Sequence, residues 1–312
     1  MNNTTLNTLK KCEEINEKVK LDKDNFIYLS EMAYENQISS IAEIIAGNDS
    51  KIGIVLIAGP SASGKTTTSL KLQDALKIRG IESVKISLDD FFLNRDALPR
   101  LEDGLPDYES VYSIDIELIN KCFDELINNG STKLPVFDFT TGKRSLTQQN
   151  EISISENHLM IVEGIHALNP ILTSNQDGTK FFRVYTSVAT QITKNDKLFA
   201  SKMDIRLIRR IIRDSAFRGS PIDNTLDMWQ KVCEGQRKYI TPYKNTADIK
   251  INSFIDYELC VYHHYLISLI DKVDDDSPHK EKIEELINIL SEFHDLDKID
   301  VPQNSLLREF LG

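Results

Sequence analysis

Cysteine, tryptophan and histidine are all scarce in this chain. Its 312 residues include four cysteines, one tryptophan and six histidines. The cysteines are far apart in the sequence and form no CxxC pair: Cys12, Cys122, Cys233 and Cys260. We therefore expect reduced thiols, and neither a disulfide framework nor a structural zinc site.

Long apolar runs and net positive charge are also lacking. No run approaches the roughly 18 apolar residues that a membrane-spanning helix needs, and the polar N-terminus lacks the apolar segment of a signal peptide. The formal net charge of -11 argues against a general nucleic-acid-binding protein, because phosphate backbones demand a basic face. A local basic pocket for a small anion stays compatible with this charge. We expect a cytoplasmic protein without nucleic-acid or membrane partners.

Short apolar runs alternate with helical patterns through the middle of the chain. The buried-strand candidates are residues 52–58, 84–88, 159–162, 181–186 and 249–251. Helical patterns lie at residues 65–79, 115–128 and 204–217. Strands that alternate with helices predict a doubly wound α/β domain with a mostly parallel sheet, which we place at residues 51–255.

Three regions fall outside this alternation. Residues 1–50 space their apolar residues as a helix does and predict an N-terminal helical extension. Residues 132–155 are rich in strand-forming residues around a Thr-Thr-Gly turn and predict an appended β-hairpin. Residues 256–312 are expected to form a C-terminal helical extension. Its apolar stripe at 283–293 either packs on the chain's own core or forms a contact in a homo-oligomer.

Residues 59–66 fit the pattern GxxxxGK[ST], directly after a predicted strand and before a predicted helix. Glycines let backbone N–H groups turn toward an anion, and the helix N-terminus adds partial positive charge. Lys65 would reach the β- and γ-phosphates of ATP, and the Thr66 hydroxyl would ligate Mg²⁺. The residues predicted to bind the nucleotide are Gly59, Ser61, Ala62, Ser63, Gly64, Lys65, Thr66 and Thr67. This segment is called the P-loop below.

Two carboxylates follow predicted strands at the edge of the sheet where the P-loop would lie. Glu163 ends the run at 159–162, and a carboxylate in that position points into the ligand crevice of a parallel sheet. It is the predicted Mg²⁺ ligand beside Thr66, unless it caps the next turn. Asp89 follows the run at 84–88 and is the candidate general base for an acceptor hydroxyl, although Asp-Asp pairs are also common in turns.

Five arginines crowd residues 204–219 of this otherwise acidic chain. They are Arg206, Arg209, Arg210, Arg213 and Arg218. Arg206, Arg210 and Arg213 share one stripe of the predicted helix. Such a stripe predicts a lid that closes over ATP, neutralises charge developing in the transition state and excludes water. The alternative is a solvated basic face.

In order and content these motifs resemble the uridine kinase and phosphoribulokinase family, most of all its bacterial branch of nucleoside kinases. The matching segments are GPSASGKTT (59–67), ISLDDFF (86–92), PVFDFTTGKRS (135–145), IVEGIHALNP (161–170), the arginine segment (206–219) and NTADIKINS (245–253). The resemblance implies a P-loop NTPase fold, with Lys65 on the phosphates, Mg²⁺ on Thr66 and Glu163, and Asp89 as general base. It places Arg206, Arg210, Arg213 and Arg218 in or near the lid, with Arg209 a further candidate.

On the acceptor side, the resemblance implies that the hairpin at 132–155 helps to form the pocket. The substrate-binding candidates, besides Asp89, are Phe92, Glu109, Phe137, Gly142 and Arg144. Pyrimidine nucleoside kinases of the family carry a tyrosine at the position of Phe137, a base-reading histidine at that of Gly142 and an aspartate at that of Glu109. Losing donors that read a base edge should cost discrimination, because the partner groups go unpaired.

We therefore predict an ATP- and Mg²⁺-dependent kinase whose acceptor is a hydroxyl of a nucleoside such as uridine or cytidine. One alternative is a kinase of another small hydroxylated metabolite, and Lys143 and Arg144 would suit an acidic one. A second alternative is a regulatory protein that senses ATP without catalysis. Asp89 favours chemistry over sensing, since a sensor needs no base for an acceptor.

Overall fold

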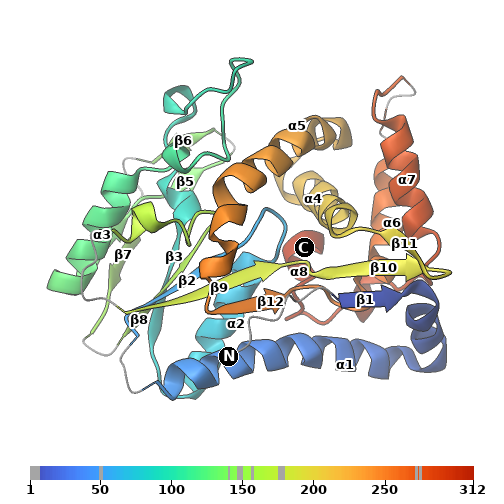
Figure 1. Cartoon of the computed structure of the whole chain (residues 1–312), viewed down its shortest axis with the longest axis horizontal. Coiled ribbons are helices and arrows are strands. Elements are labelled where there is room, and N and C mark those ends of the chain that lie inside the picture. Colours follow the sequence, from blue (N-terminus) through green and yellow to red (C-terminus); the bar gives the residue numbers. More distant parts are fainter. Residues whose placement is uncertain are drawn as a thin grey trace.

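A five-stranded parallel sheet forms the centre of the molecule, in the order β12-β9-β2-β8-β3 (Figure 1). The computed structural model describes residues 8–48, 52–139, 141–145, 150–155, 158–174, 180–270, 273 and 276–312. The five strands are β2 (Ile54–Ala58), β3 (Ser83–Ser87), β8 (Leu159–Glu163), β9 (Phe181–Ser187) and β12 (Ile249–Asn252). Each overlaps one predicted strand, so the predicted parallel sheet is confirmed.

The sheet separates two hydrophobic cores, because successive side chains of a strand point to opposite faces. Val55 and Ile57 of β2 belong to one core, and Ile54 and Leu56 belong to the other. The first core contains side chains of α1 (Cys12–Ala46), α2 (Lys65–Ile78), α4 (Lys202–Arg218), α5 (Ile222–Gly235) and α6 (Glu258–Ile270), and the second those of α3 (Ile116–Asn129). Helices cover both faces, as a doubly wound fold requires.

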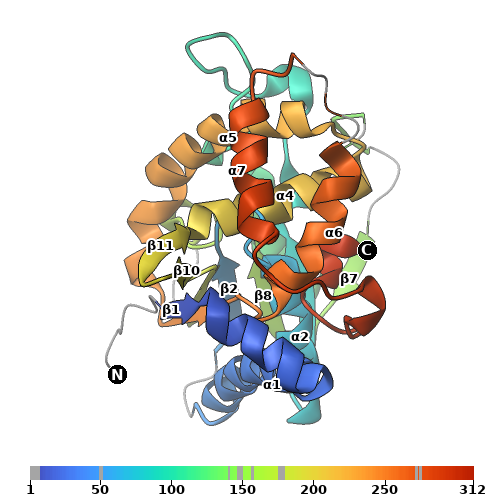
Figure 2. The ribbon, with the colours of Figure 1, turned by 90° about the vertical axis from the view of Figure 1, so that its right-hand side faces the viewer.

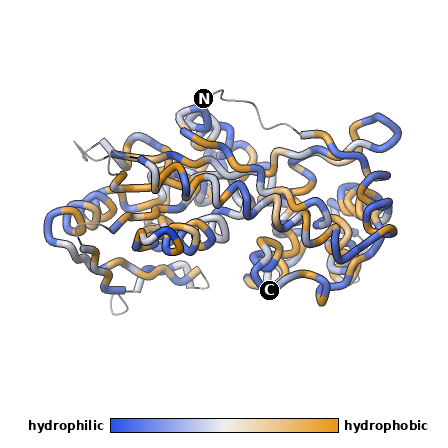
Figure 3. Tube along the Cα trace, turned by 90° about the horizontal axis from the view of Figure 1, so that it is seen from below, coloured by the Kyte–Doolittle hydropathy of each residue, from blue (hydrophilic) through white to orange (hydrophobic). Residues whose placement is uncertain are grey.

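Local signals explain where the helices around the site begin and end. Ser201 and Asp204 form a reciprocal capping box at the start of α4, and Gly219 ends this helix in a left-handed conformation. Asp115 caps α3 by accepting a hydrogen bond from the Leu118 amide. Figure 3 shows hydrophobic and polar residues alternating along the helices, as expected where one helix face packs on a sheet.

Two small antiparallel ladders are appended beside α3. β4 (Ser131–Leu134) pairs with β7 (Asn150–Ser153), and β5 (Phe137–Asp138) pairs with β6 (Lys143–Arg144). They occupy the predicted hairpin segment, of which residues 140 and 146–149 lie outside the described part of the chain. Figure 1 places both ladders at the end of the molecule opposite to α6 and α7 (Lys280–Leu290).

A second sheet of three strands was not predicted. β1 (Thr8–Lys11) runs parallel to β10 (Thr190–Lys194), which pairs in turn with β11 (Lys197–Ala200). β1 lies in the segment interpreted as helical, so that interpretation is wrong for these four residues. From Cys12 to Ala46 the chain is helical except for a kink at Asp22, where φ is -159° and ψ is 89°. The predicted extension also includes residues 1–7 and 49–50, which lie outside the described residues.

The N-terminal helix α1 packs on α2, and α7, toward the C-terminus, packs on α6. The Tyr34 hydroxyl of α1 lies 2.7 Å from the Thr68 hydroxyl of α2. The apolar stripe lies on α7 (Lys280–Leu290), beside α6, where Ile283, Leu286 and Leu290 are buried in the same core as α1 (Figure 2). This stripe therefore packs on the chain's own core. No helix of the described residues has the length and apolar character to cross a membrane.

Candidate active site

The P-loop joins β2 to α2 at the carboxyl edge of the sheet, where β2 lies between β8 and β9. Ligands of open parallel sheets bind at such a switch in strand order. An added Cβ on Gly59 would lie 2.0 Å from the Thr186 carbonyl oxygen, so only glycine fits there. Gly64 has φ +79°, and Ala62 has φ +58°, a conformation that non-glycine residues rarely adopt. The loop is thus held in the turned conformation that exposes backbone N–H groups to an anion.

Lys65 of α2 and Glu163 of β8 lie within electrostatic reach of each other. The Lys65 ammonium donates a hydrogen bond to the Pro60 carbonyl oxygen at 3.2 Å. Burial lowers the pKa of Lys65, against the opposing effect of Glu163 and Asp89. Burial also raises the pKa of Glu163 to about 7, and the charge of Asp89 adds to this rise. Buried charges of both signs with displaced pKa values are typical of sites that handle charged ligands.

Oxygen atoms from three elements converge beside the P-loop. The Thr66 hydroxyl lies 3.4 Å from Glu163 Oε1, and the Ser87 hydroxyl of β3 donates to the same oxygen at 3.1 Å. Mg²⁺ prefers such hard oxygen ligands and usually takes one or two carboxylates together with phosphate oxygens and water. The residues present therefore fit an Mg²⁺ ion bound together with a nucleotide. Ser87 was not predicted, although its place at the carboxyl end of a predicted strand was a usable signal.

The α4 arginines turn toward the P-loop and meet it at Ser61. Arg206 donates from Nε and Nη2 to the Ser61 carbonyl oxygen, at 3.1 and 3.0 Å. Arg210 and Arg213 donate to the Ser61 hydroxyl at 2.9 and 3.3 Å. Three guanidinium groups thus converge on the loop expected to hold phosphates. The alternative of a solvated basic face does not describe these three arginines.

Asp214 holds the C-terminal arginines of α4 together. This buried carboxylate pairs with Arg210 and Arg218 at 3.2 Å and with Arg213 at 3.1 Å. Arg218 is the most exposed of the three, with 43% of its side chain open to solvent against 12% for Arg210 and 14% for Arg213. A shared carboxylate limits the repulsion between the three cations and fixes their directions.

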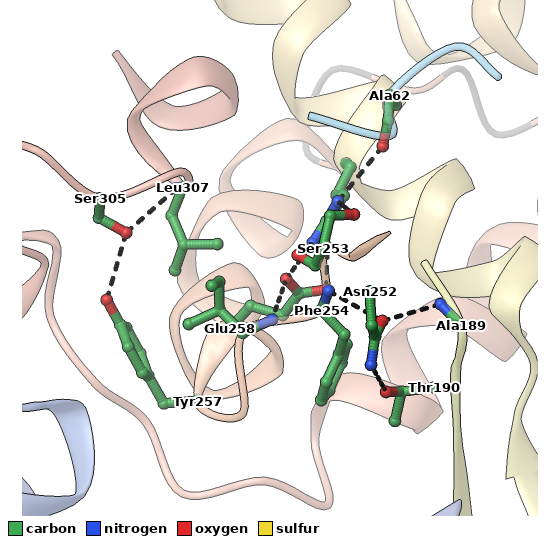
Figure 4. A network of polar contacts seen from close by, with 12 residues as sticks. Ala62, Ala189, Thr190, Asn252, Ser253, Phe254, Tyr257, Glu258, Ser305 and Leu307 are labelled. Atoms are coloured by element: carbon green, nitrogen blue, oxygen red, sulfur yellow. Dashed lines mark hydrogen bonds and ion pairs between the residues drawn. The ribbon is translucent and has the colours of Figure 1, made fainter. Parts of the chain in front are cut away.

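Arg209 differs from the other arginines because its side chain is fully buried. It pairs with Glu258 of α6, which is equally buried, and donates to the Ser253 carbonyl oxygen at 2.7 Å. It also donates to the Ala62 carbonyl oxygen of the P-loop at 3.4 Å (Figure 4). Arg209 therefore supports the P-loop from inside the protein, and we correct its assignment as a candidate lid residue.

A cavity of about 1220 Å³ opens beside the P-loop and brings most of the predicted acceptor-side residues together. Asp89 borders it from the short 3₁₀ helix Leu88–Phe91 that follows β3. The other predicted residues along the cavity are Ser61, Phe92, Glu109, Phe137, Gly142, Arg210 and Arg218. The candidate base and Ser61 of the P-loop thus open onto one space, whereas Lys65 and Thr66 are not among the residues that line it.

Aromatic side chains form one wall of this cavity. The rings of Phe92, Phe137 and Phe139 lie 5.1 to 6.1 Å apart between centroids, in tilted and edge-to-face arrangements. Gly142 lies beside them, and an added Cβ would come within 2.7 Å of Arg95 Nε. Such a wall offers apolar contact to a flat ring and few hydrogen bonds to its edge.

Glu109 adds a polar group to the lining of the cavity. Its Oε2 atom is buried and has no hydrogen-bond partner among the described residues. Burial raises the pKa of this carboxyl to about 7, against the attraction of Arg210 and Arg206. A buried polar atom without a partner is costly, so a ligand hydroxyl at this position would be stabilising.

The structure corrects the assignment of Arg144 as a substrate-binding residue. Its guanidinium pairs with Asp115 at 2.9 Å and donates to the carbonyl oxygens of Phe91 and Phe92 at 3.1 and 3.2 Å. It is absent from the residues that line the cavity. Arg144 ties the β5–β6 ladder to the segment after β3, which leaves an acidic acceptor without this partner.

Two further cavity residues were missed. Tyr239 donates a hydrogen bond to Asp107 at 3.1 Å, and both line the cavity. The buried ring of His166 lies edge-on to Tyr239, and burial lowers the pKa of this histidine to about 4, so its ring is neutral near pH 7. Asp107 lies two residues before Glu109, which was the only signal for it in the sequence.

The parallel sheet, the P-loop, the buried carboxylates and the arginine helix define a P-loop phosphotransferase. Residues 54–259 match the model of the Phosphoribulokinase / Uridine kinase family. The chain belongs to this family, and it is accordingly a kinase with a hydroxyl acceptor. This confirms the resemblance inferred from the motifs.

Individual proteins show the same similarity. The chain is 29% identical over 203 residues to a uridine kinase of Macrococcus caseolyticus, covering 65% of this chain and 88% of that one. It is 27% identical over 203 residues to a uridine kinase of Bacillus pumilus, with 65% and 87% covered. A structure described as a fructose transport system kinase from Silicibacter shares the fold, with a TM-score of 0.50, 20% identity, and 68% and 98% covered.

Proposed function

We propose that this kinase transfers the γ-phosphoryl group of ATP, bound with Mg²⁺, to a hydroxyl of a nucleoside, with uridine and cytidine as the first candidates. The observation that carries the proposal is that Ser61 of the P-loop and Asp89 open onto the same cavity. The phosphoryl donor, ATP, and the acceptor hydroxyl can therefore meet in this cavity. The uridine kinases among the relatives support the choice of acceptor.

In this mechanism the protein supplies position and charge. Lys65 and the N-terminus of α2 hold the phosphates. Thr66 and Glu163 would hold Mg²⁺, which would supply positive charge against the phosphate oxygens. Asp89 accepts the proton of the acceptor hydroxyl as its oxygen bonds to the γ-phosphorus. The bond from that phosphorus to the bridging oxygen breaks, and ADP leaves with the electron pair. Arg210 and Arg213, which already meet at Ser61, stabilise the charge in transit.

The lining of the cavity supports a nucleoside as acceptor. The wall of Phe92, Phe137 and Phe139 suits the faces of a planar base, and Glu109 offers an unpartnered oxygen to a ribose hydroxyl. The position of Gly142 contributes no side chain to read the base edge. We therefore propose a site that holds the base by its faces and the sugar by hydrogen bonds.

A screen of acceptors tests the function directly. ADP release is measured with nucleosides, pentose derivatives and amino acids as acceptors, and we expect release that depends on a pyrimidine nucleoside. Asp89→Asn should lower the nucleoside-dependent turnover by at least about a hundredfold, because general-base catalysis is lost. ATP affinity, measured by calorimetry, should be kept.

Asp90→Asn is the matched control, because it removes the neighbouring carboxylate of the same segment, which does not line the cavity. Its turnover should stay close to that of the wild type. Turnover that depends only on pentose derivatives or amino acids would refute a nucleoside acceptor. Equal turnover in Asp89→Asn and the wild type would remove Asp89 from the mechanism.

Glu163→Gln should separate stability from activity. Burial favours the protonated form of Glu163, whose pKa rises from 4.5 to about 7 on folding. The wild type therefore loses stability as the pH rises from about 4.5 to 7, and the neutral amide avoids that loss. We expect the variant to be more stable by about 2–3 kcal/mol at pH 8 and nearly equal at pH 4, with turnover lost. Urea unfolding of both proteins at the two pH values measures the difference in the free energy of unfolding. A difference that is the same at both pH values would show that the Glu163 carboxyl is not its source.

A further inference from the structure

The C-terminal tail, residues 302–312, is built into the protein next to the P-loop. Its apolar side chains are buried in the core that contains α1 and α2: Leu306, Leu307, Phe310 and Leu311. The Ser305 hydroxyl accepts a hydrogen bond from the Leu307 amide (Figure 4). It donates to Glu31 of α1. The backbone of the tail is therefore anchored by its buried side chains and by these hydrogen bonds.

Two of these buried side chains contact the phosphate cradle or its support. An added Cβ on Gly64 would lie 2.6 Å from Leu306 Cδ1, so the tail packs directly on the glycine that precedes α2. The Phe310 ring lies 4.9 Å from the guanidinium carbon of Arg209, which supports the P-loop through Ala62. The tail is thus part of the wall around the P-loop.

The carboxylate of Glu309, on the short helix α8 (Arg308–Leu311), lies at the N-terminus of α2. Its Oε2 atom accepts hydrogen bonds from the Thr67 amide at 3.0 Å and from the Thr67 hydroxyl at 2.6 Å. The first amides of a helix have no partner within the helix and carry partial positive charge, so they bind anions. In a P-loop these amides face the phosphates of the nucleotide.

The Glu309 carboxylate caps α2 at an amide that a bound phosphate would also need. The Thr67 amide cannot serve a phosphate and the Glu309 carboxylate at full strength together. The two anions would also repel each other, and Glu163 adds a further carboxyl within electrostatic reach of Glu309. Glu309 is partly exposed, unlike its neighbours Phe310 and Leu311. Its side chain can therefore rotate toward solvent while the rest of the tail stays packed.

We propose that Glu309 is a built-in competitor of the nucleotide, occupying a phosphate position until the triphosphate displaces its carboxylate. This inference rests on the proposed nucleotide site. It predicts that the free protein is stabilised by the contact with Thr67, and that each binding event must first break it. The apparent affinity for the nucleotide is then lower than the P-loop alone would give.

The test compares the wild type with Glu309→Gln, Glu309→Ala and a control, Glu17→Gln. Glu17 is exposed on α1, so its replacement changes the net charge equally without touching the P-loop. Calorimetry measures the Kd for ATP and for inorganic tripolyphosphate, each with Mg²⁺. Both Glu309 variants should bind both ligands about tenfold more tightly, because a charge-assisted hydrogen bond no longer has to be broken. Without ligand, Glu309→Ala should melt at a lower temperature than the wild type.

The outcomes separate this inference from the proposed function. Equal ATP affinity in the wild type and both Glu309 variants would overturn the inference and leave the ATP site intact. Tighter binding of ATP but not of tripolyphosphate would also overturn it, because the competition would then concern the nucleoside. Failure of the wild type and every variant to bind ATP would refute the proposed donor, and the inference with it. The same gain in Glu17→Gln would assign the effect to net charge and reject a local competitor.

Discussion

Replacing Lys65 by alanine should lower the turnover about a thousandfold or more with every acceptor. A rate loss of this size is expected when a cation that stabilises the transferred phosphoryl group is removed. The Lys65 ammonium lies within electrostatic reach of Glu163, Asp89 and Glu309, and a bound phosphate would add further negative charge beside it. The fold should survive, since the variant removes a buried charge whose pKa burial already lowers. Steady-state ADP release and thermal unfolding measure the two effects.

Lys71→Ala is the matched control for this variant. Lys71 lies on the same helix, α2, but pairs with Glu35 of α1 outside the site. Its loss should leave turnover within a few fold of the wild type and cost a little stability. Wild-type turnover in Lys65→Ala would contradict the phosphate-binding role of the P-loop itself, and with it the proposed donor.

The central sheet and the P-loop could be predicted because their signals are local. A strand buried on both faces is a short apolar run, and 52–58 and 159–162 are such runs. The P-loop adds a glycine pattern at the junction of strand and helix, where only a few residues satisfy the backbone. Polar strands carry no such signal. β1 has the sequence TLKK and pairs with β10 about 180 residues away, so its partner decides its structure.

The individual roles of the arginines could not be read from the sequence. Helical periodicity places Arg206, Arg210 and Arg213 on one stripe, and the structure directs all three at Ser61. Periodicity says nothing about Glu258, which is 49 residues from Arg209 and turns it into a buried support. Arg144 was misassigned for the same reason, because its partner Asp115 lies 29 residues earlier.

No pattern in the sequence predicted that the C-terminal tail forms part of the site. Glu309 meets Thr67 across 242 residues, and neither residue alone signals the contact. The sequence predicted a phosphate loop and a C-terminal helical extension over residues 256–312. Only the packing of Leu306 and Phe310 places a carboxylate where a phosphate is expected. Long-range contacts of this kind depend on the whole fold and not on a local pattern.

Replacing Glu258 by alanine should lower the free energy of unfolding by about 3–5 kcal/mol, because it leaves the buried charge of Arg209 without its partner. Both side chains are fully buried, so water cannot take the place of the carboxylate. Urea denaturation measures the loss. A loss below about 1 kcal/mol, the range of exposed pairs, would show that Arg209 finds another partner or reaches solvent.

The double variant Arg209→Met with Glu258→Leu separates stability from positioning. Apolar side chains of similar volume often replace a buried ion pair without loss of stability, so most of the free energy of unfolding should return. The Ala62 carbonyl would still lack its donor, and Ala62 holds a strained backbone conformation in the P-loop. We therefore expect ATP affinity to stay reduced in the refolded double variant. Wild-type affinity there would mean that the pair stabilises the fold but does not shape the phosphate site.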